Sequence, residues 1–304
     1  MTIILPQDYR YRKDLEKLRI HCITPEQAQR QDIRALRIGI LNIMPEAHKY
    51  EFNLLYPLGR SVLQIEPVWI KLESHVYKSS DHEHLKNVYK TYEEANKEGK
   101  LDALIVTGAP VELLEFEEVL YWDEIKEILE DARKNIFSTL GICWGGLALA
   151  YLMGIPKINY PKKLFGVFEV WNIDRTHPVT GNMDDVFWVP QSRHAGIRDE
   201  DLEDAARNNE VRLLAYGKEV GYTIFESYDR KFLIHLGHPE YNTRRLIEEY
   251  ERDMKKGRTD VDPPKNIDFT NPINRWRSHR NEFFTEWIRY CYSQLNLDLY
   301  VNFY

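Results

Sequence analysis

The amino-acid sequence predicts an α/β fold built on a doubly wound, mostly parallel sheet with an antiparallel extension. In the first half of the chain, strand-like runs alternate with helix-like runs, which is typical of a parallel sheet covered on both faces. The first strand-like run, residues 36–44, is almost continuously apolar, as expected for a parallel strand buried on both sides. After residue 154 several short strand-like runs follow one another, which indicates the antiparallel extension.

The elements of the parallel part follow from apolar runs and the residues that end them. Thr24 followed by Pro25 is typical of a helix start, so a short helix is expected over residues 25–31. Strands are expected over residues 36–44, 64–72 and 102–110, and helices over residues 50–60, within residues 85–98 and over residues 121–134. The carboxyl ends of these strands should lie along one edge of the sheet, where ligands bind in such folds.

The most informative stretch is residues 137–146, which read Phe-Ser-Thr-Leu-Gly-Ile-Cys-Trp-Gly-Gly. With the helix-prone residues 147–153, they predict a strand, a sharp turn and a helix, with the thiol of Cys143 at the turn. A nucleophile in such a turn projects from the sheet, and small neighbours let a substrate approach. The start of the following helix favours the thiolate. A buried cysteine that only fills space is the alternative, and the glycines on both sides favour the nucleophile.

The second half of the chain is predicted to complete the sheet and then to add helices. Strands are expected over residues 164–168, 186–189, 211–216, 222–225 and 231–236, and helices over residues 242–256 and 283–295. No repeat or long linker interrupts the chain, so we expect one domain over residues 1–304. Its parts are an N-terminal segment (1–34), the α/β core (35–256) and a C-terminal helical extension (257–304).

The composition excludes several classes of function. A formal net charge of −7 is not that of a protein with a broad basic surface for nucleic acid. The three cysteines, Cys22, Cys143 and Cys291, are too few and too far apart for a disulfide framework or a zinc site, so no metal is expected. No apolar run approaches the length of a membrane span, and we therefore expect a cytoplasmic protein without a membrane partner.

A cysteine nucleophile needs a base, and the base needs a group that orients it. His238 leaves the end of a predicted strand and is followed by Pro239 and Glu240, so a rigid turn presents an imidazole and a carboxylate two residues apart. Glu240 can hold the imidazole in one tautomer and stabilise its charged form. His235 lies inside the apolar run and fits a packed core residue better.

The Gly-x-Cys-x-Gly turn and the later Gly-His-Pro-Glu sequence together resemble the class I glutamine amidotransferase fold, a flavodoxin-like sheet whose catalytic triad is Cys, His and Glu. Within that superfamily the chain is more similar to the MetA-type homoserine O-acyltransferases of methionine biosynthesis, over nearly its whole length. The segments that carry this resemblance are residues 34–45, 106–110, 121–122, 143–144, 163–169, 192–193, 237–241, 251–253 and 276–279, together with Trp287.

The resemblance implies a two-step acyl transfer with acyl-CoA as co-substrate and no permanently bound cofactor. Cys143 would attack the thioester and become acylated while CoA leaves. His238, oriented by Glu240, would then deprotonate the hydroxyl of the acceptor amino acid, which takes the acyl group. The backbone N–H groups of Trp144 and, by analogy to the fold, Ala109 would stabilise the oxyanion. The family also suggests a homodimer that acts on small molecules.

Three further residues, Lys163, Ser192 and Arg252, match substrate-binding positions of the family. Taken alone, the two cations fit exposed surface charges, although a guanidinium suits bidentate binding of an amino-acid carboxylate. Glu112 matches a position that is glutamate in acetyl-transferring enzymes and glycine in succinyl-transferring ones. A carboxylate there repels the distal carboxylate of a succinyl group, so acetyl-CoA is the expected donor.

The resemblance implies L-homoserine as the acceptor, but the sequence departs from the family pattern at two places. Glu46-Ala-His-Lys-Tyr-Glu51 stands where the family usually has Thr-Lys-x-Glu-Thr-Glu, and Gln191 stands where a histidine is usual. Both places are expected near the mouth of the site, so serine, one methylene shorter, is the competing acceptor. A homoserine O-succinyltransferase and a glutamine amidotransferase-like hydrolase are further alternatives, although no segment resembles the synthetase that an amidotransferase would serve.

Overall fold

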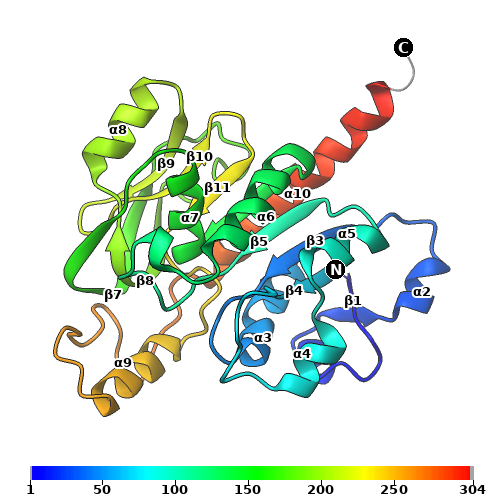
Figure 1. Cartoon of the computed structure of the whole chain (residues 1–304), viewed down its shortest axis with the longest axis horizontal. Helices are drawn as coiled ribbons and strands as arrows, with labels where there is room; N and C mark the ends of the chain where they lie inside the picture. Colours follow the sequence, from blue (N-terminus) through cyan, green and yellow to red (C-terminus); the bar gives the residue numbers. More distant parts are fainter. Residues whose placement is uncertain (1, 302–304) are drawn as a thin grey trace.

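The computed structural model describes residues 2–301, and its strands form one sheet (Figure 1). The strand order is β2-β1-β4-β3-β5-β6-β11-β10-β9-β7-β8. The strands are β1 (Thr2–Ile4), β2 (His21–Ile23), β3 (Leu36–Leu41), β4 (Gln64–Ile70), β5 (Ala103–Val106), β6 (Ser138–Ile142), β7 (Ile158–Asn172), β8 (Val186–Gly196), β9 (Val211–Gly217), β10 (Gly221–Ser227) and β11 (Phe232–His235). The helices are α1 (Arg12–Lys17), α2 (Pro25–Gln29), α3 (Ala47–Leu58), α4 (His82–Val88), α5 (Tyr92–Glu98), the 3-10 helix η1 (Phe116–Glu118), α6 (Trp122–Asn135), α7 (Trp144–Leu152), α8 (Asp199–Arg207), α9 (Arg245–Lys255) and α10 (Arg277–Val301).

The part of the sheet from β2 to β11 in this order is parallel, and the rest is antiparallel. Every pairing up to the one between β6 and β11 is parallel. The pairings among β11, β10, β9, β7 and β8 are antiparallel. One face of the sheet packs against α1, α3, α4 and α10, and the other against α5, α6, α7 and α8. The predicted doubly wound sheet with an antiparallel extension is therefore confirmed.

The C-terminal helix belongs to the core. Helix α10 runs beside the middle of the sheet (Figure 1), and the side chains of Phe284 and Trp287 are fully buried. The indole Nε1 of Trp287 donates a hydrogen bond to Oγ of Ser138, the first residue of β6, at 3.1 Å. The helix begins at Arg277, earlier than the expected residue 283, because polar residues form its first turn.

Several elements were not predicted, and each lacks a strong local signal. Strands β1 and β2 have three residues each, too few to show a periodic pattern, yet they extend the parallel edge of the sheet. Helix α8 has only Leu202 and Ala205 as its buried face, so its apolar signal is weak. Strands β7 and β8 extend beyond their apolar runs into polar residues that include Lys163 and Ser192.

Two kinds of feature are absent from the part of the chain that the structure describes. No helix within residues 2–301 is both long and apolar enough to cross a membrane. Among residues 2–295, whose side chains the structure describes, no group of three or more histidine, cysteine or acidic side chains is arranged to hold a metal ion.

Candidate active site

Cys143 lies in a strained turn between the central strand β6 and helix α7. Its backbone has φ +52° and ψ −114°, a conformation that residues with a side chain rarely adopt and that clusters at functional sites. Its N–H donates to the carbonyl oxygen of His235, on the neighbouring strand β11, at 2.9 Å. The predicted strand, turn and helix are present, and the turn holds the thiol at the carboxyl edge of the sheet.

The glycines around Cys143 have a different role from the one predicted. A Cβ atom added at Gly145 would lie 2.3 Å from the carbonyl oxygen of Val106, and one added at Gly141 would lie 2.7 Å from the backbone of Gly145. Neither glycine lines the cavity at Cys143. They allow α7 to pack closely against β5 and β6, so they fix the turn and do not open a path for substrate.

The imidazole of His238 lies beside the thiol. The backbone N–H of His238 donates to the carbonyl oxygen of Pro190 at 2.8 Å, which fixes the turn after β11. A methyl group added at Gly108 would lie 3.5 Å from Cε1 of His238 and 3.6 Å from Cβ of Cys143, so both side chains meet at this glycine. Nδ1 of His238 donates to Oε1 of Glu240 at 2.7 Å, because a carboxylate only accepts. Nε2 is left as the nitrogen that can exchange a proton with the thiol.

The surroundings of His238 favour its charged form. The side chain is buried, and burial alone would lower its pKa. The neighbouring Cys143 and Glu240 outweigh burial and raise the pKa of His238 well above its ordinary value. A protonated imidazole beside a thiol favours the thiolate, which is the nucleophilic form. His235, by contrast, packs edge-on against Phe283, and burial lowers its pKa to about 3, as expected for a core histidine.

Most of the predicted site residues line one cavity of about 730 Å³. They are Ala109, Glu112, Cys143, Lys163, Ser192, His238 and Arg252. Glu240 lies behind His238, and the side chain of Trp144 packs in an aromatic cluster with Phe116 and Trp122. A cavity of about 830 Å³ between α5 and α6 is larger, but its described lining contains no cysteine or histidine, so size alone does not identify the reactive site.

A lysine and two carboxylates form a charged wall of the cavity. Nζ of Lys163 lies 3.0 Å from Oδ2 of Asp253 and 3.7 Å from Oε2 of Glu249. Glu249 also accepts hydrogen bonds from the hydroxyls of Ser192, at 2.5 Å, and Tyr241, at 2.7 Å. Burial would raise the pKa of Glu249, but Lys163 and other cationic neighbours lower it to about 2. Glu249 is therefore a carboxylate at neutral pH.

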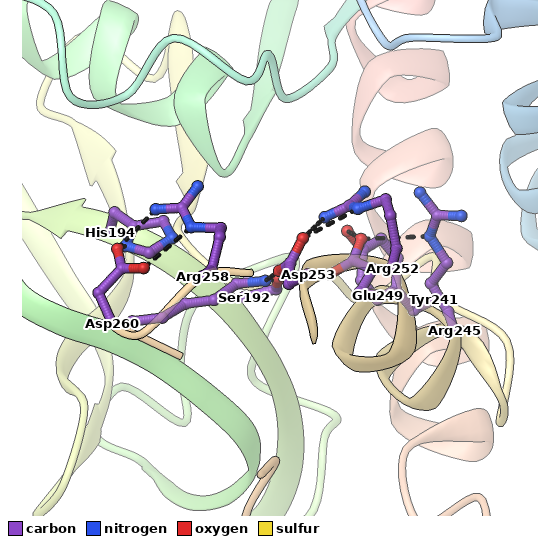
Figure 2. Close-up of polar contacts among 10 residues, drawn as sticks. Ser192, His194, Tyr241, Arg245, Glu249, Arg252, Asp253, Arg258 and Asp260 are labelled. Atoms are coloured by element: carbon purple, nitrogen blue, oxygen red, sulfur yellow. Dashed lines mark hydrogen bonds and ion pairs between the residues drawn. The ribbon is translucent and has the colours of Figure 1, made fainter. Parts of the chain in front are cut away.

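Helix α9 presents a row of charged residues to the cavity. Four charged residues lie three or four positions apart, so they share one face of the helix and its C-terminal end. All four line the cavity: Arg245, Glu249, Arg252 and Lys256. Nε and Nη2 of Arg252 both donate to Oδ1 of Asp253, at 3.0 and 2.9 Å (Figure 2). Sequence reasoning named only Arg252 in this row, although helical spacing from that residue could have identified the other three.

A second ionic group lies at the same cavity (Figure 2). Arg258 donates to both oxygens of Asp260, at 2.9 and 2.5 Å, and Nδ1 of His194 lies 3.6 Å from Asp260. Burial, followed by the charges of Arg258 and Lys163, lowers the pKa of His194. His194 is therefore a neutral imidazole in the cavity wall, and sequence reasoning did not identify it.

Glu112 lies half-buried in the loop after β5. Burial raises the pKa of Glu112, although the charges of Lys163, His238 and Arg258 act in the opposite direction. The carboxyl group is therefore within electrostatic reach of the base and of both cations. Its place in the cavity wall is compatible with the predicted role in selecting the acyl group, which stays a prediction.

Two backbone N–H groups are available near the thiol. Trp144 is the first residue of α7, and the first N–H groups of a helix have no partner within it. Ala109 follows Gly108 in the loop after β5 and lines the cavity. Within residues 2–301, neither N–H donates to a backbone carbonyl oxygen. The oxyanion hole itself stays a prediction.

Only one of the two departures from the family pattern reaches the cavity. Glu46 lines it, with φ +53°, and its carboxylate pairs with Lys49. Gln191 is buried, where it donates to Thr223 at 2.8 Å and accepts from Arg193 at 3.0 Å. The expectation that Gln191 lies near the mouth was wrong, because successive residues of β8 face opposite sides of the sheet and this one faces the core.

Tyr50, on α3, was also missed. Its hydroxyl donates to Oε1 of Glu240, the oxygen that also accepts from His238. No local pattern marks a buried tyrosine as part of a site, and only its position in the altered stretch 46–51 singles it out.

Comparison with known protein families gives one match over nearly the whole chain. A family model described as "HTS: Homoserine O-succinyltransferase" matches residues 2–297. The chain is 42% identical over 296 residues to a protein from Bacillus cereus named homoserine O-acetyltransferase, with 95% of this chain and 97% of the relative covered. It is also 42% identical over 307 residues to a homoserine O-acetyltransferase from Petrotoga mobilis, with 98% of each chain covered.

Solved structures with a similar fold include glutamine amidotransferases. One from Thermotoga maritima aligns with a TM-score of 0.57 at 14% identity, covering 85% of this chain and 99% of the other. Another, from Methylobacillus flagellatus, aligns with a TM-score of 0.53 at 12% identity, covering 85% and 96%. At such identities the likeness shows the fold alone, and it confirms the predicted glutamine amidotransferase-like architecture.

Proposed function

The chain belongs to the homoserine O-succinyltransferase family, and we propose that it is a homoserine O-acetyltransferase that makes O-acetyl-L-homoserine from acetyl-CoA in methionine biosynthesis. The observation that carries the proposal is the cavity in which Cys143, His238 and Glu112 meet the charged face of α9. This reaction needs a nucleophile, a base, a group that discriminates between acyl groups and a surface that binds a zwitterionic amino acid. The cavity offers a candidate for each.

The first half-reaction transfers the acetyl group to the thiol of Cys143. The Cys143 thiolate attacks the carbonyl carbon of acetyl-CoA, and the oxyanion is stabilised by the N–H groups of Trp144 and Ala109. The C–S bond to CoA breaks, and His238 gives its proton to the CoA thiolate as it leaves. The product is an acetyl-thioester on Cys143, and His238 is left neutral.

The second half-reaction transfers the acetyl group from Cys143 to the acceptor. Neutral His238, held by Glu240 through Nδ1, takes the proton of the acceptor hydroxyl as its oxygen attacks the thioester. The bond to the sulfur of Cys143 breaks, and the thiolate and imidazolium are restored. No resident cofactor is needed, since acetyl-CoA is consumed as a substrate.

The charged wall suits an amino acid as acceptor. An ammonium group can bind the Glu249 carboxylate, which already accepts hydrogen bonds from Ser192 and Tyr241. A carboxylate group can bind Arg252 or Lys163, whose present partner is Asp253. Tyr241 also stacks on the imidazole of His238, with ring centroids 4.1 Å apart, so the acceptor wall and the base are directly connected.

Acetyl-CoA is preferred over succinyl-CoA because of Glu112. A second carboxylate on the acyl chain would enter a half-buried space next to this side chain, where like charges repel strongly. The choice of homoserine over serine is the finer point, because Glu46 replaces the usual residue at the cavity. One methylene distinguishes acceptors by only about 1–3 kcal/mol.

The test combines two donors with two acceptors. Acetyl-CoA or succinyl-CoA is mixed with L-homoserine or L-serine, and release of the CoA thiol is followed. We expect the fastest release with acetyl-CoA and homoserine. Faster release with serine would identify a serine O-acetyltransferase, and faster release with succinyl-CoA a succinyltransferase. Glutamine hydrolysis without CoA release would favour the amidotransferase-like alternative.

Intact-mass measurement tests the nucleophile separately. Acetyl-CoA without acceptor should add one acetyl group to the wild type and none to Cys143→Ala. Cys22→Ala is the matched control, because Cys22 is a buried cysteine at the far edge of the sheet and should leave the adduct unchanged. An adduct that persists in Cys143→Ala would show that the nucleophile lies elsewhere.

We also propose that the protein works in the cytoplasm as a homodimer on small molecules, without nucleic acid or membrane as a partner. This proposal rests on the family. Light scattering should give twice the mass of one chain, and the mass of a single chain would contradict it.

A further inference from the structure

A buried tyrosine stands behind the triad. Tyr50 is 3% exposed and does not line the cavity, so it cannot touch a substrate there. Its hydroxyl donates to Oε1 of Glu240, which also accepts from Nδ1 of His238 at 2.7 Å. The other oxygen of Glu240, Oε2, has no hydrogen-bond partner among residues 2–295, whose side chains the structure describes. Two donors, one of them the proposed base, therefore share a single carboxylate oxygen.

We propose that Tyr50 is a positioning residue that shares Oε1 of Glu240 with His238 and thereby controls how readily His238 gives up its proton between the two half-reactions. The proposal rests on the proposed function only in taking Cys143 as nucleophile and His238 as base.

The direction of the effect follows from charge. While His238 is protonated, a positive partner compensates the buried carboxylate of Glu240. Once His238 is neutral, that carboxylate depends more on its other donor, so the Tyr50 hydroxyl stabilises the neutral state more than the charged one. Tyr50 therefore lowers the pKa of His238 and moderates the rise that Cys143 and Glu240 cause. Since the acceptor is deprotonated by neutral imidazole, the tyrosine favours the second half-reaction.

Tyr50 remains a donor at every working pH, and no other group takes its place. Burial, followed by the charge of Glu240, raises the pKa of Tyr50 well above its ordinary value, so the phenol stays neutral. The other titratable or charged groups that act on Tyr50, Glu240 or His238 are Glu112, Cys143, His235, Tyr241, Arg245, Glu249 and Arg280. In the described part of the chain, none of these donates a hydrogen bond to Glu240.

The test uses the full chain and p-nitrophenyl acetate, so it needs neither acyl-CoA nor homoserine. Cys143 attacks the ester, an S–acetyl bond forms, the ester C–O bond breaks and p-nitrophenolate leaves. Water then attacks the thioester, its proton passes to His238, the C–S bond breaks and acetate leaves. The rate of this second step is measured from steady-state turnover after the burst, and its pH midpoint reports His238.

Tyr50→Phe should move this midpoint up by about one pH unit and slow the step about ten-fold below the midpoint, with a wild-type rate on the alkaline plateau. 3-Fluorotyrosine at position 50 is a stronger donor of similar size, so it should move the midpoint down. Tyr9→Phe is the matched control, because Tyr9 is also buried and donates to a buried carboxylate, that of Glu51, and it should leave the profile unchanged. In a Glu240→Gln background, adding Tyr50→Phe should cause no further shift.

An unchanged midpoint in Tyr50→Phe, or an equal loss at every pH, would overturn the proposal. An equal shift in Tyr9→Phe, or a full shift in the Glu240→Gln background, would do so as well. If Tyr50→Phe does not fold, the fluorotyrosine profile decides, and a midpoint that stays or rises refutes the proposal. Wild-type turnover by Cys143→Ala would refute the nucleophile and with it this inference. The expected shifts without any acetyl-CoA turnover would refute only the proposed function.

Discussion

Replacing Lys163 by methionine should destabilise the fold strongly at neutral pH. The ammonium group lies 3.0 Å from Asp253 and 3.7 Å from Glu249, and these side chains are only 4–5% exposed. Methionine keeps most of the volume but leaves two buried carboxylates without this partner, a change that typically costs about 3–5 kcal/mol. For Glu249, a pKa of about 2 in place of 4.5 corresponds to roughly 3 kcal/mol at neutral pH, shared among its cationic neighbours. We expect the free energy of unfolding to fall by about 3 kcal/mol at neutral pH.

The loss should become smaller in acid. Because the pKa of Glu249 is lowered on folding, its carboxylate stabilises the native state above the unfolded pKa, and this contribution disappears as the pH falls from about 4 towards 2. In Lys163→Met the same carboxylates should bind protons at higher pH. Protonation then removes the unpaired buried charge from the variant. The difference in the free energy of unfolding between variant and wild type therefore becomes smaller as the pH is lowered from neutral.

Lys162→Met is the matched control for this experiment. Lys162 also pairs with an aspartate, Asp262, at 2.9 Å, but it is 61% exposed. An exposed pair contributes at most about 1 kcal/mol, so this variant should unfold almost as the wild type does. Urea denaturation followed by tryptophan fluorescence, at neutral and at acidic pH, measures both variants. Equal losses for the two lysines, or a Lys163→Met deficit that grows in acid, would refute the reasoning.

Three other changes test the acyl pocket, the turn and the C-terminal helix. Glu112→Gly removes the carboxylate expected to repel a succinyl group, so the kcat/KM for succinyl-CoA relative to acetyl-CoA should rise at least about ten-fold in the CoA-release assay, and an unchanged ratio would contradict this role. Gly145→Ala should lower the free energy of unfolding by about 2 kcal/mol or more, because its Cβ would lie 2.3 Å from a carbonyl oxygen, and a wild-type urea midpoint would speak against the tight packing. Trp287→Phe should cost about 1–2 kcal/mol, since it leaves the Ser138 hydroxyl without its donor, and thermal unfolding measures the change.

The parallel part of the sheet could be predicted because its signal is local. Strands β3 and β5 are mostly apolar runs, and α6 carries its apolar residues at helical spacing. The short strands β1 and β2 gain their stability from pairing with a sheet that already exists, and no three-residue pattern can reveal that. Helix α8 was missed for a related reason, because its two buried residues become significant only where they pack on β9 and β10.

The site residues also divide into those with a local sequence signal and those that only tertiary packing brings to the site. Cys143, His238 and Glu240 stand in turns marked by glycine or proline, so their place at strand ends could be read from the chain. Tyr50 could not, because it meets Glu240 across 190 positions of sequence and only the packing of α3 on the sheet brings them together. Gln191 was misjudged because a single step along β8 decides between the cavity and the core.

The position of α10 has a consequence for how the protein is made. Ribosomes release the N-terminal part of a chain first, and α10 follows β6 and the other described helices and strands in the sequence. Its buried Trp287 contacts Ser138 on β6, the strand that leads into the nucleophile. During translation, the strand that leads to Cys143 therefore lacks its packing against α10 until that helix has left the ribosome. A nascent chain should not consume acetyl-CoA, and truncation before Arg277 should abolish activity although every residue of the cavity is retained.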